Sequence, residues 1–224
     1  MPSGVTTTFI IAEALFLGTG VMIAVATVLW MKEVNNAPTT SSVARLILIS
    51  HFPMQALLAN AIMIFITTLN SVPALLMPTS RVWLKFHGWL VVLCAIFTLI
   101  LGLNEWLQTL TTRANLLTYW GQQPDNVQSL VQEKFNCCGY TNYTTPPFIT
   151  DSVCPSAEIA AARGGCVGPF AQYAERFLNL VFTAAFGVVG LDMLLLLSLA
   201  MVIKRRKESL RYRRIDEKRG MGSI

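Results

Sequence analysis

Four long apolar stretches constrain the fold of this chain more than any other feature. A helix needs about 20 predominantly apolar residues to cross the hydrocarbon core of a bilayer. Buried helices of soluble proteins seldom run this long without an amphipathic stripe. The stretches therefore predict an all-α integral membrane protein with four transmembrane helices, which cover residues 9–31, 46–69, 86–103 and 177–203.

The composition excludes several classes of protein. Hydrophobic residues make up 54% of the chain and charged residues 13%, whereas soluble domains carry about 25% charged residues. So little polar surface does not suit a soluble enzyme, a nucleic-acid-binding protein or a disordered chain. The two histidines leave little room for metal or acid–base chemistry, and no catalytic sequence motif is present. We therefore expect no enzymatic activity, no metal and no nucleic-acid partner.

The positions of Lys and Arg predict the orientation, because cytoplasmic flanks of spans are enriched in these residues. The segment after the fourth stretch holds nine of the 17 basic residues. The connection 70–85 adds Arg81 and Lys85, whereas the long connection 104–176 holds only four. We therefore expect both termini in the cytoplasm, and the connections 32–45 and 104–176 outside a plasma membrane or an endomembrane.

The basic tail has two interpretations. Residues 204–207 abut the membrane and serve as a stop-transfer signal, or they attract anionic lipids of the inner leaflet by about 1 kcal/mol each. The rest of the tail mixes Glu208, Asp216 and Glu217 with basic residues and is predicted to be mobile.

The long connection is predicted to form a helical extracellular subdomain. Its first part continues the third span as a helix to Trp120, and Gly121 and Pro124 then end that helix. A second helix is expected from Asp125, where Gln128 would complete a capping box. An irregular stretch, 139–165, precedes a helix that enters the fourth span. The predicted parts are 1–103 (three spans), 104–176 (outer subdomain), 177–203 (fourth span) and 204–224 (tail).

Cysteines indicate that this subdomain faces an oxidising compartment, because four of the five lie in it. A vicinal bridge would be strained, so two pairings remain, nested or crossed, and each is worth about 3 kcal/mol. The fifth cysteine, Cys94, lies within the third span and is expected to pack as an apolar residue. The four predicted to form disulfides are Cys137, Cys138, Cys154 and Cys166.

The irregular stretch has the character of a recognition surface. It carries few charges and several prolines, and a disulfide-braced aromatic loses little entropy on binding. Tyr140, Tyr143, Phe148 and Ile149 are the candidate partner-binding residues, although the aromatics could instead cap the small core; exposure is favoured for Phe148. Asn142 begins an Asn-Tyr-Thr sequon and is a candidate glycosylation site.

These features together resemble the tetraspanin family over essentially the whole chain. The specific part is Cys137-Cys138-Gly139 between the third and fourth spans, followed by Gly165-Cys166. The resemblance implies the nested pairing, Cys137 with Cys166 and Cys138 with Cys154. The segments FNCCGY, PPFITDSVCPS and YRRIDEKRG look most like filamentous-fungal tetraspanins associated with appressorial penetration, and hence with virulence. Cys94 lies too deep in its span to match the palmitoylated juxtamembrane cysteines of many members.

Polar residues inside the spans are a second set of candidates. Glu13, Asn60 and Asp192 lie in apolar surroundings, where a charge costs about 2.5–3.5 kcal/mol or more. They could line a cavity that binds a sterol or lipid, which the family resemblance supports, or form a proton or ion path. The favoured interpretation is that they join helices by hydrogen bonds, with Asp192 protonated. Small residues expected to allow close helix packing are Gly18, Gly20, Ala24, Gly102, Gly187 and Gly190.

The predicted function is that of a membrane scaffold. Such a protein recruits partner membrane proteins, or further copies of itself, laterally and through its outer loop. The alternative is a small transporter or channel that uses Glu13, Asn60 and Asp192. No cofactor is expected other than a bound sterol or lipid.

Overall fold

The computed structural model describes residues 4–76 and 82–218. Helix accounts for 81% of the structure, and no strand occurs in the described residues. The helices are α1 (Gly4–Val34), α2 (Val43–Ile49), α3 (Met54–Leu76), α4 (Val82–Leu110), α5 (Thr112–Gly121), α6 (Asp125–Phe135), α7 (Ala157–Arg163) and α8 (Val167–Lys218). Four of them, α1, α3, α4 and α8, are long and apolar enough to cross a membrane, as expected.

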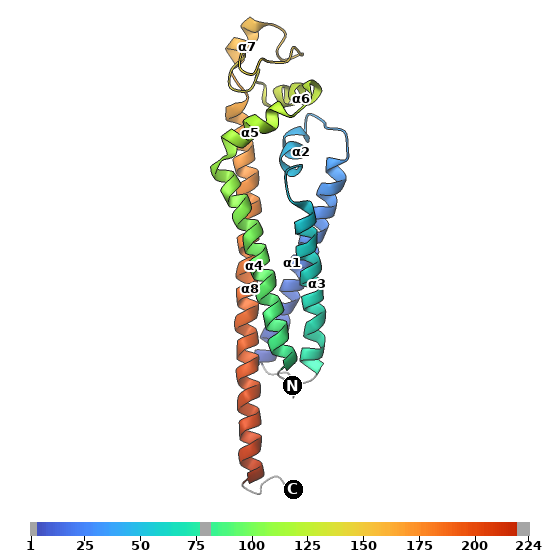
Figure 1. Ribbon diagram of the computed structural model, residues 1–224, viewed down its shortest axis with the longest axis vertical. Helices are drawn as coiled ribbons and strands as arrows, with labels where there is room; N and C mark the ends of the chain where they lie inside the picture. The colour runs from blue at the N-terminus through green and yellow to red at the C-terminus, as the bar shows by residue number, and fades with distance from the viewer. Residues whose placement is uncertain (1–3, 77–81, 219–224) are drawn as a thin grey trace. The chain divides into compact units, whose positions relative to one another are not determined.

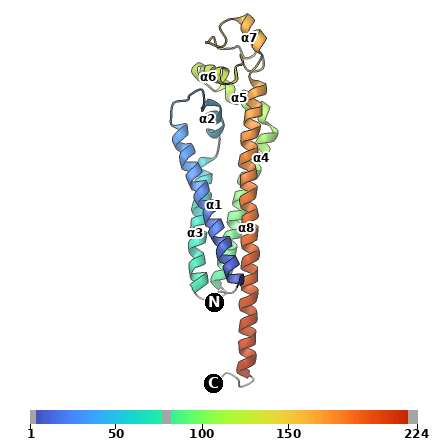
Figure 2. The ribbon, with the colours of Figure 1, turned by 180° about the vertical axis from the view of Figure 1, so that it is seen from behind.

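The chain divides into two compact units, and α1, α4 and α8 contribute residues to both. The bundle unit comprises the described residues within 1–26, 55–101 and 185–224, and the cystine unit comprises 27–54 and 102–184. In the bundle unit, segments of α1, α3, α4 and α8 run side by side (Figures 1 and 2). The cystine unit contains the short helices α2, α5, α6 and α7.

The second apolar stretch forms two helices instead of the single helix predicted over 46–69. Helix α2 ends at Ile49, and α3 begins at Met54. Pro53 explains the break, because proline has no N–H to donate and disfavours helix in the residue before it. The span therefore extends further along the chain, to Leu76, and includes Pro73.

Close packing in the bundle unit relies on two glycines, of which the sequence indicated one. A Cβ at Gly20 of α1 would lie 2.6 Å from Cγ2 of Ile64 in α3. A Cβ at Gly88 of α4, which was not predicted, would lie 2.8 Å from Cδ2 of Leu199 in α8. Nothing lies within 4 Å of a Cβ built at Gly18, Gly187 or Gly190, so the expectation of close packing was wrong at these positions.

The core of the cystine unit is built from residues far apart in the sequence. Buried residues of α2 pack with residues of α5, α6 and α8 and with the loop after α6. Trp120 and Tyr140 are its largest fully buried side chains, with ring centroids 5.6 Å apart. A small second cluster joins Cys138, Cys154 and Ala160 of α7.

Local structure in the cystine unit differs from the expectations at three points. The helix after the third span is interrupted at Thr111, which precedes α5. Helix α6 begins at Asp125 as expected, but Gln128 forms no capping box; its amide donates to the Trp120 carbonyl at 3.2 Å. Helix α7 lies in the stretch expected to be irregular, and the side chain of Ser156 caps it.

The tail is helical, contrary to the predicted mobile segment. Helix α8 continues without a break to Lys218, because residues 204–218 contain neither Gly nor Pro and are rich in Arg and Lys, which favour helix. Arg206 donates to the Ala74 carbonyl of α3 at 2.9 Å, which satisfies one of the unpaired carbonyls near the end of that helix. Residues 219–224 and the predicted cytoplasmic Arg81 lie outside the described residues.

Candidate functional site

Two disulfides brace the segment between α6 and α8. Cys137 bonds to Cys166 and Cys138 to Cys154, with Cα–Cα distances of 5.0 and 5.9 Å. This is the nested pairing that the tetraspanin resemblance implies. Cys94 is free and buried in the bundle unit. The loops closed by the bridges span 29 and 16 residues, so each bridge restricts the unfolded chain by about 3 kcal/mol or slightly more.

The glycines beside these cysteines allow two backbone segments to lie against each other. Gly139 has φ of +70°, and a Cβ there would lie 2.3 Å from the Asn142 carbonyl oxygen. A Cβ at Gly165 would lie 2.3 Å from the Thr141 carbonyl oxygen. The close approach lets the Cys166 amide donate to the Gly139 carbonyl at 3.0 Å. The Cys-Cys-Gly and Gly-Cys motifs thus require glycine, because any side chain at either position would overlap a backbone carbonyl.

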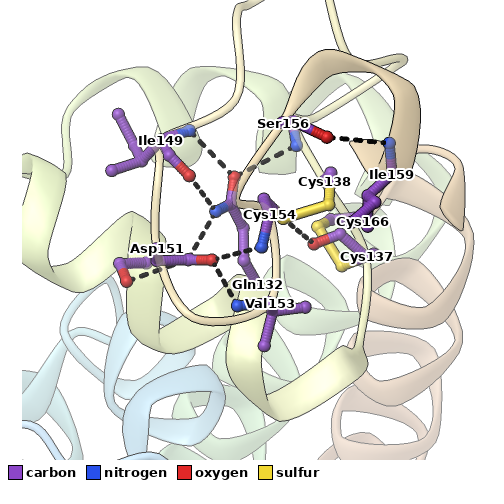
Figure 3. Close-up of a disulfide and its surroundings, with 12 residues drawn as sticks. Gln132, Cys137, Cys138, Ile149, Asp151, Val153, Cys154, Ser156, Ile159 and Cys166 are labelled. Carbon is purple, nitrogen blue, oxygen red and sulfur yellow. Dashed lines mark hydrogen bonds between the residues drawn. A yellow bond between two sulfur atoms is a disulfide. The ribbon is translucent and has the colours of Figure 1, made fainter. Parts of the chain in front are cut away.

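Gln132 of α6 holds the irregular stretch in place (Figure 3). Its side chain is fully buried. The amide oxygen accepts from the backbone N–H groups of Gly139 and Ile149, each at 3.1 Å. The amide nitrogen donates to the Ile149 carbonyl at 2.8 Å and to Asp151 at 2.7 Å. One side chain therefore pairs buried backbone groups that would otherwise lack partners.

Asp151 completes this network and shapes the turn before Cys154 (Figure 3). Its Oδ1 accepts from the backbone N–H groups of Val153 and Cys154 at 2.9 and 2.7 Å. Its Oδ2 accepts from the Ser129 hydroxyl at 2.9 Å. Neither Gln132 nor Asp151 shows a periodic or motif signal in the sequence, so neither was predicted to belong to the site.

The four candidate partner-binding residues occupy different environments. Tyr140 is only 2% exposed and packs in the main core, which agrees with the alternative that it caps the core. Phe148, expected to be exposed, is partly buried against the Cys138–Cys154 cluster. Tyr143 is 38% exposed. Ile149 is half-buried, and its side chain points away from Gln132 (Figure 3).

Asn142 is exposed and its side chain is held by the sequon itself. The carboxamide oxygen accepts from the Thr144 hydroxyl at 2.8 Å and from the backbone N–H groups of Thr144 and Thr145 at 2.9 and 2.7 Å. These bonds use the oxygen and not the amide nitrogen, which is the atom that a glycan would modify.

A polar contact joins the first connection to α6 within the cystine unit. The ammonium of Lys134 donates to the Ser41 carbonyl and lies 4.9 Å from the ring centroid of Tyr173. The Thr40 hydroxyl donates to Glu133 at 3.0 Å. Burial, and secondly the charge of Arg45, lowers the pKa of Lys134.

The three intramembrane candidates lie buried in the bundle unit, with separate neighbours. Asn60 of α3 exchanges hydrogen bonds with Thr98 of α4, the shorter at 2.9 Å. A carboxylate oxygen of Glu13 lies 3.2 Å from Nε2 of His87. Asp192 is 1% exposed, and its oxygens have no hydrogen-bond partner among the described residues.

Polar residues on α3 and α4 form a seam that was not predicted from the sequence. Asn60 and Thr67 are seven residues apart on α3, as are His87 and Cys94 on α4, so each pair shares one helix face. The Thr67 hydroxyl lies 3.4 Å from the Cys94 sulfur, and His87 Nδ1 lies 3.1 Å from the Thr67 carbonyl oxygen. Sequence places each residue on a helix face but does not give the relative depth of two helices.

No group of three or more potential metal ligands occurs in the described part of the chain. No family model, curated protein or solved structure matches the chain.

Proposed function

We propose that this protein is a membrane organiser that binds partner membrane proteins through its cystine unit. The observation that carries the proposal is the braced stretch 139–154. Two disulfides and the Gln132–Asp151 network fix its backbone, while Tyr143 stays exposed. A preformed loop with an exposed aromatic loses little conformational entropy when it binds a partner.

Four membrane-spanning helices and the distribution of Lys and Arg support the proposed topology. Both termini lie in the cytoplasm, and the disulfides lie on the opposite side of a plasma membrane or endomembrane, where oxidising conditions maintain them. Asn142 then faces the compartment in which glycans are added. The basic residues 204–207 contact anionic lipids of the inner leaflet.

The proposal also includes membership of the tetraspanin family, in a filamentous-fungal group that acts in host penetration. Its support is the combination of four candidate spans, a vicinal cysteine pair followed by a glycine, and the nested bridges. The structural demand for glycine at positions 139 and 165 adds to that support, because it explains the motif in physical terms.

A partner-capture experiment tests the organiser function. Cross-linked membranes are solubilised, and the full chain is recovered with its partners. The double variant Tyr143→Ala, Ile149→Ala should reduce capture about tenfold, equivalent to about 1.4 kcal/mol, with disulfides and surface delivery intact. The matched control is Tyr212→Ala, because Tyr212 is also exposed but lies in the tail helix. Truncation after Lys207 should likewise leave capture unchanged.

The opposite outcome locates recognition elsewhere. If truncation abolishes capture and the double variant does not, the tail binds the partner and the proposal fails.

The alternative of a transporter or channel has weaker support. Glu13 and Asn60 contact different residues, His87 and Thr98, which is the arrangement expected of polar residues that join helices. Flux through reconstituted protein that Asp192→Asn abolishes would favour the alternative. A bound sterol or lipid at these residues stays a proposal, which copurification of lipid with the protein tests.

A further inference from the structure

Glu13 and His87 meet inside an apolar region of the bundle unit. On α1, Phe9 and Phe16 flank Glu13 four residues before it and three after it, and both are fully buried. On α4, Leu84 and Val91 are buried in the same way around His87. The two polar groups therefore occupy the core-facing positions of their helices, where water does not compete for hydrogen bonds.

The Thr67 carbonyl determines which nitrogen of His87 carries a proton. Nδ1 lies 3.1 Å from this oxygen, and a carbonyl can only accept, so Nδ1 must donate. In a neutral imidazole Nε2 then has a bare lone pair. That lone pair lies 3.2 Å from Oε2 of Glu13, and neither carboxylate oxygen has another partner among the described residues.

We propose that Glu13 and His87 form a proton-binding site that links α1 to α4. An ionised carboxylate facing a bare lone pair is repulsive and leaves a net charge of −1 in an apolar region. One proton between Nε2 and Oε2 makes the pair neutral overall and turns the contact into a charge-assisted or neutral hydrogen bond. This inference goes beyond the proposed organiser function.

Among the described residues, His87 is the titratable partner of Glu13. The other titratable groups that the bundle unit buries, among its described residues, are the Asp192 carboxyl of α8 and the Cys94 thiol of α4. Helix α3 offers the Thr67 carbonyl and no titratable group. Lys85 of α4 is exposed, and Arg206 of α8 donates to the Ala74 carbonyl. The shared proton is thus the polar link between α1 and α4.

The small number of histidines makes the site directly observable. The chain contains only His51 and His87, so ¹⁵N-histidine labelling of the full chain in lipid nanodiscs gives two imidazoles. His51 is an internal control, because its Nδ1 also lies 2.9 Å from a carbonyl, that of Ile47, while its Nε2 faces no carboxylate in the described residues. We expect His87 Nδ1 to resonate as N–H and its Nε2 to be displaced from the bare-nitrogen position.

The variant Glu13→Ala should move His87 Nε2 to the bare position and leave the signals of His51 unchanged. A bare Nδ1 on His87, or an Nε2 signal that is identical in the wild type and Glu13→Ala, would overturn the proposal.

Unfolding experiments test the role of the proton separately. Glu13→Gln supplies a permanent N–H donor to Nε2, so its Tm should stay within about 2 °C of the wild type at neutral pH. Glu13→Ala provides no hydrogen-bonding group and should lose about 5 °C at the same pH. If Glu13→Gln loses as much as Glu13→Ala, the hydrogen bond contributes little and the proposal fails.

Discussion

Gly139 lets two backbone segments approach more closely than any side chain would permit. Its φ of +70° is accessible to glycine at little cost, and the Asn142 carbonyl occupies the space of a Cβ. The two cysteines directly before this glycine, Cys137 and Cys138, form the bridges to Cys166 and Cys154. We therefore expect the backbone turn at Gly139 to support both disulfides.

Substituting this glycine should be more damaging than substituting another glycine with a similar conformation. In Gly139→Ala the new Cβ overlaps the backbone, and the positive φ itself costs about 1–2 kcal/mol. We therefore expect the variant to lose more than about 3 kcal/mol of folding stability and to contain free thiols. Gly164→Ala is the matched control, since Gly164 has φ of +75° but nothing within 4 Å, and should cost only the conformational term. Thermal unfolding measures the stability of the two variants, and thiol labelling measures their free cysteines. Equal losses of stability in Gly139→Ala and Gly164→Ala would contradict the predicted overlap.

Gln132 offers a second test at the residue scale. Gln132→Leu leaves the buried N–H groups of Gly139 and Ile149 and the carboxylate of Asp151 without this partner, so we expect a loss of about 3 kcal/mol or more. Gln122→Leu, at an exposed position, should change stability by less than about 0.5 kcal/mol. Similar unfolding temperatures for the two variants would mean that the network contributes little.

At the scale of elements, α6 is held to the first connection by Lys134 and Glu133. We expect Lys134→Met combined with Thr40→Val to remove both contacts and to speed proteolysis within residues 35–42 by about tenfold, because a hydrogen bond to a charged group contributes roughly 1.5–3 kcal/mol. Lys207→Met, at an exposed tail position, is the control and should leave the cleavage rate unchanged. An unchanged rate in the double variant would show that packing of α2 on α6 suffices.

Apolar length was enough to predict the four spans, but their limits depended on other residues. Pro53 moves the second span towards the C-terminus, although a proline near a span end is not by itself a reliable stop signal. The helical tail follows from the helix propensity summed over residues 204–218, whereas the mixed charges led to the prediction of a mobile segment.

The contacts of the site were less predictable than the helices. The Glu13–His87 contact could not be predicted, because two apolar helices can slide past each other by a turn without changing their sequence patterns. Tyr140 of the loop after α6 packs against Trp120 of α5, which is distant in the sequence.

At the scale of the whole molecule, the proposed topology makes a direct prediction. Protease added to intact cells should cut the long connection and spare an epitope tag placed after Ile224, since Lys and Arg gather on the proposed cytoplasmic side. After permeabilisation the tag should be lost. Immunoblots before and after permeabilisation measure both; loss of the tag from intact cells would reverse the topology.

Helix α2 completes the core of the cystine unit although it precedes the second span in the chain. Its Ile47 and Leu48 pack in the same cluster as Trp120 and Phe170. A recombinant fragment limited to residues 104–176, the natural choice for crystallisation or for raising antibodies, would leave that apolar surface facing water. Antibodies raised against such a fragment would recognise a face that the intact protein conceals. A soluble reagent should therefore carry residues 43–49 on a flexible linker, as a short helix that restores the missing side of the core.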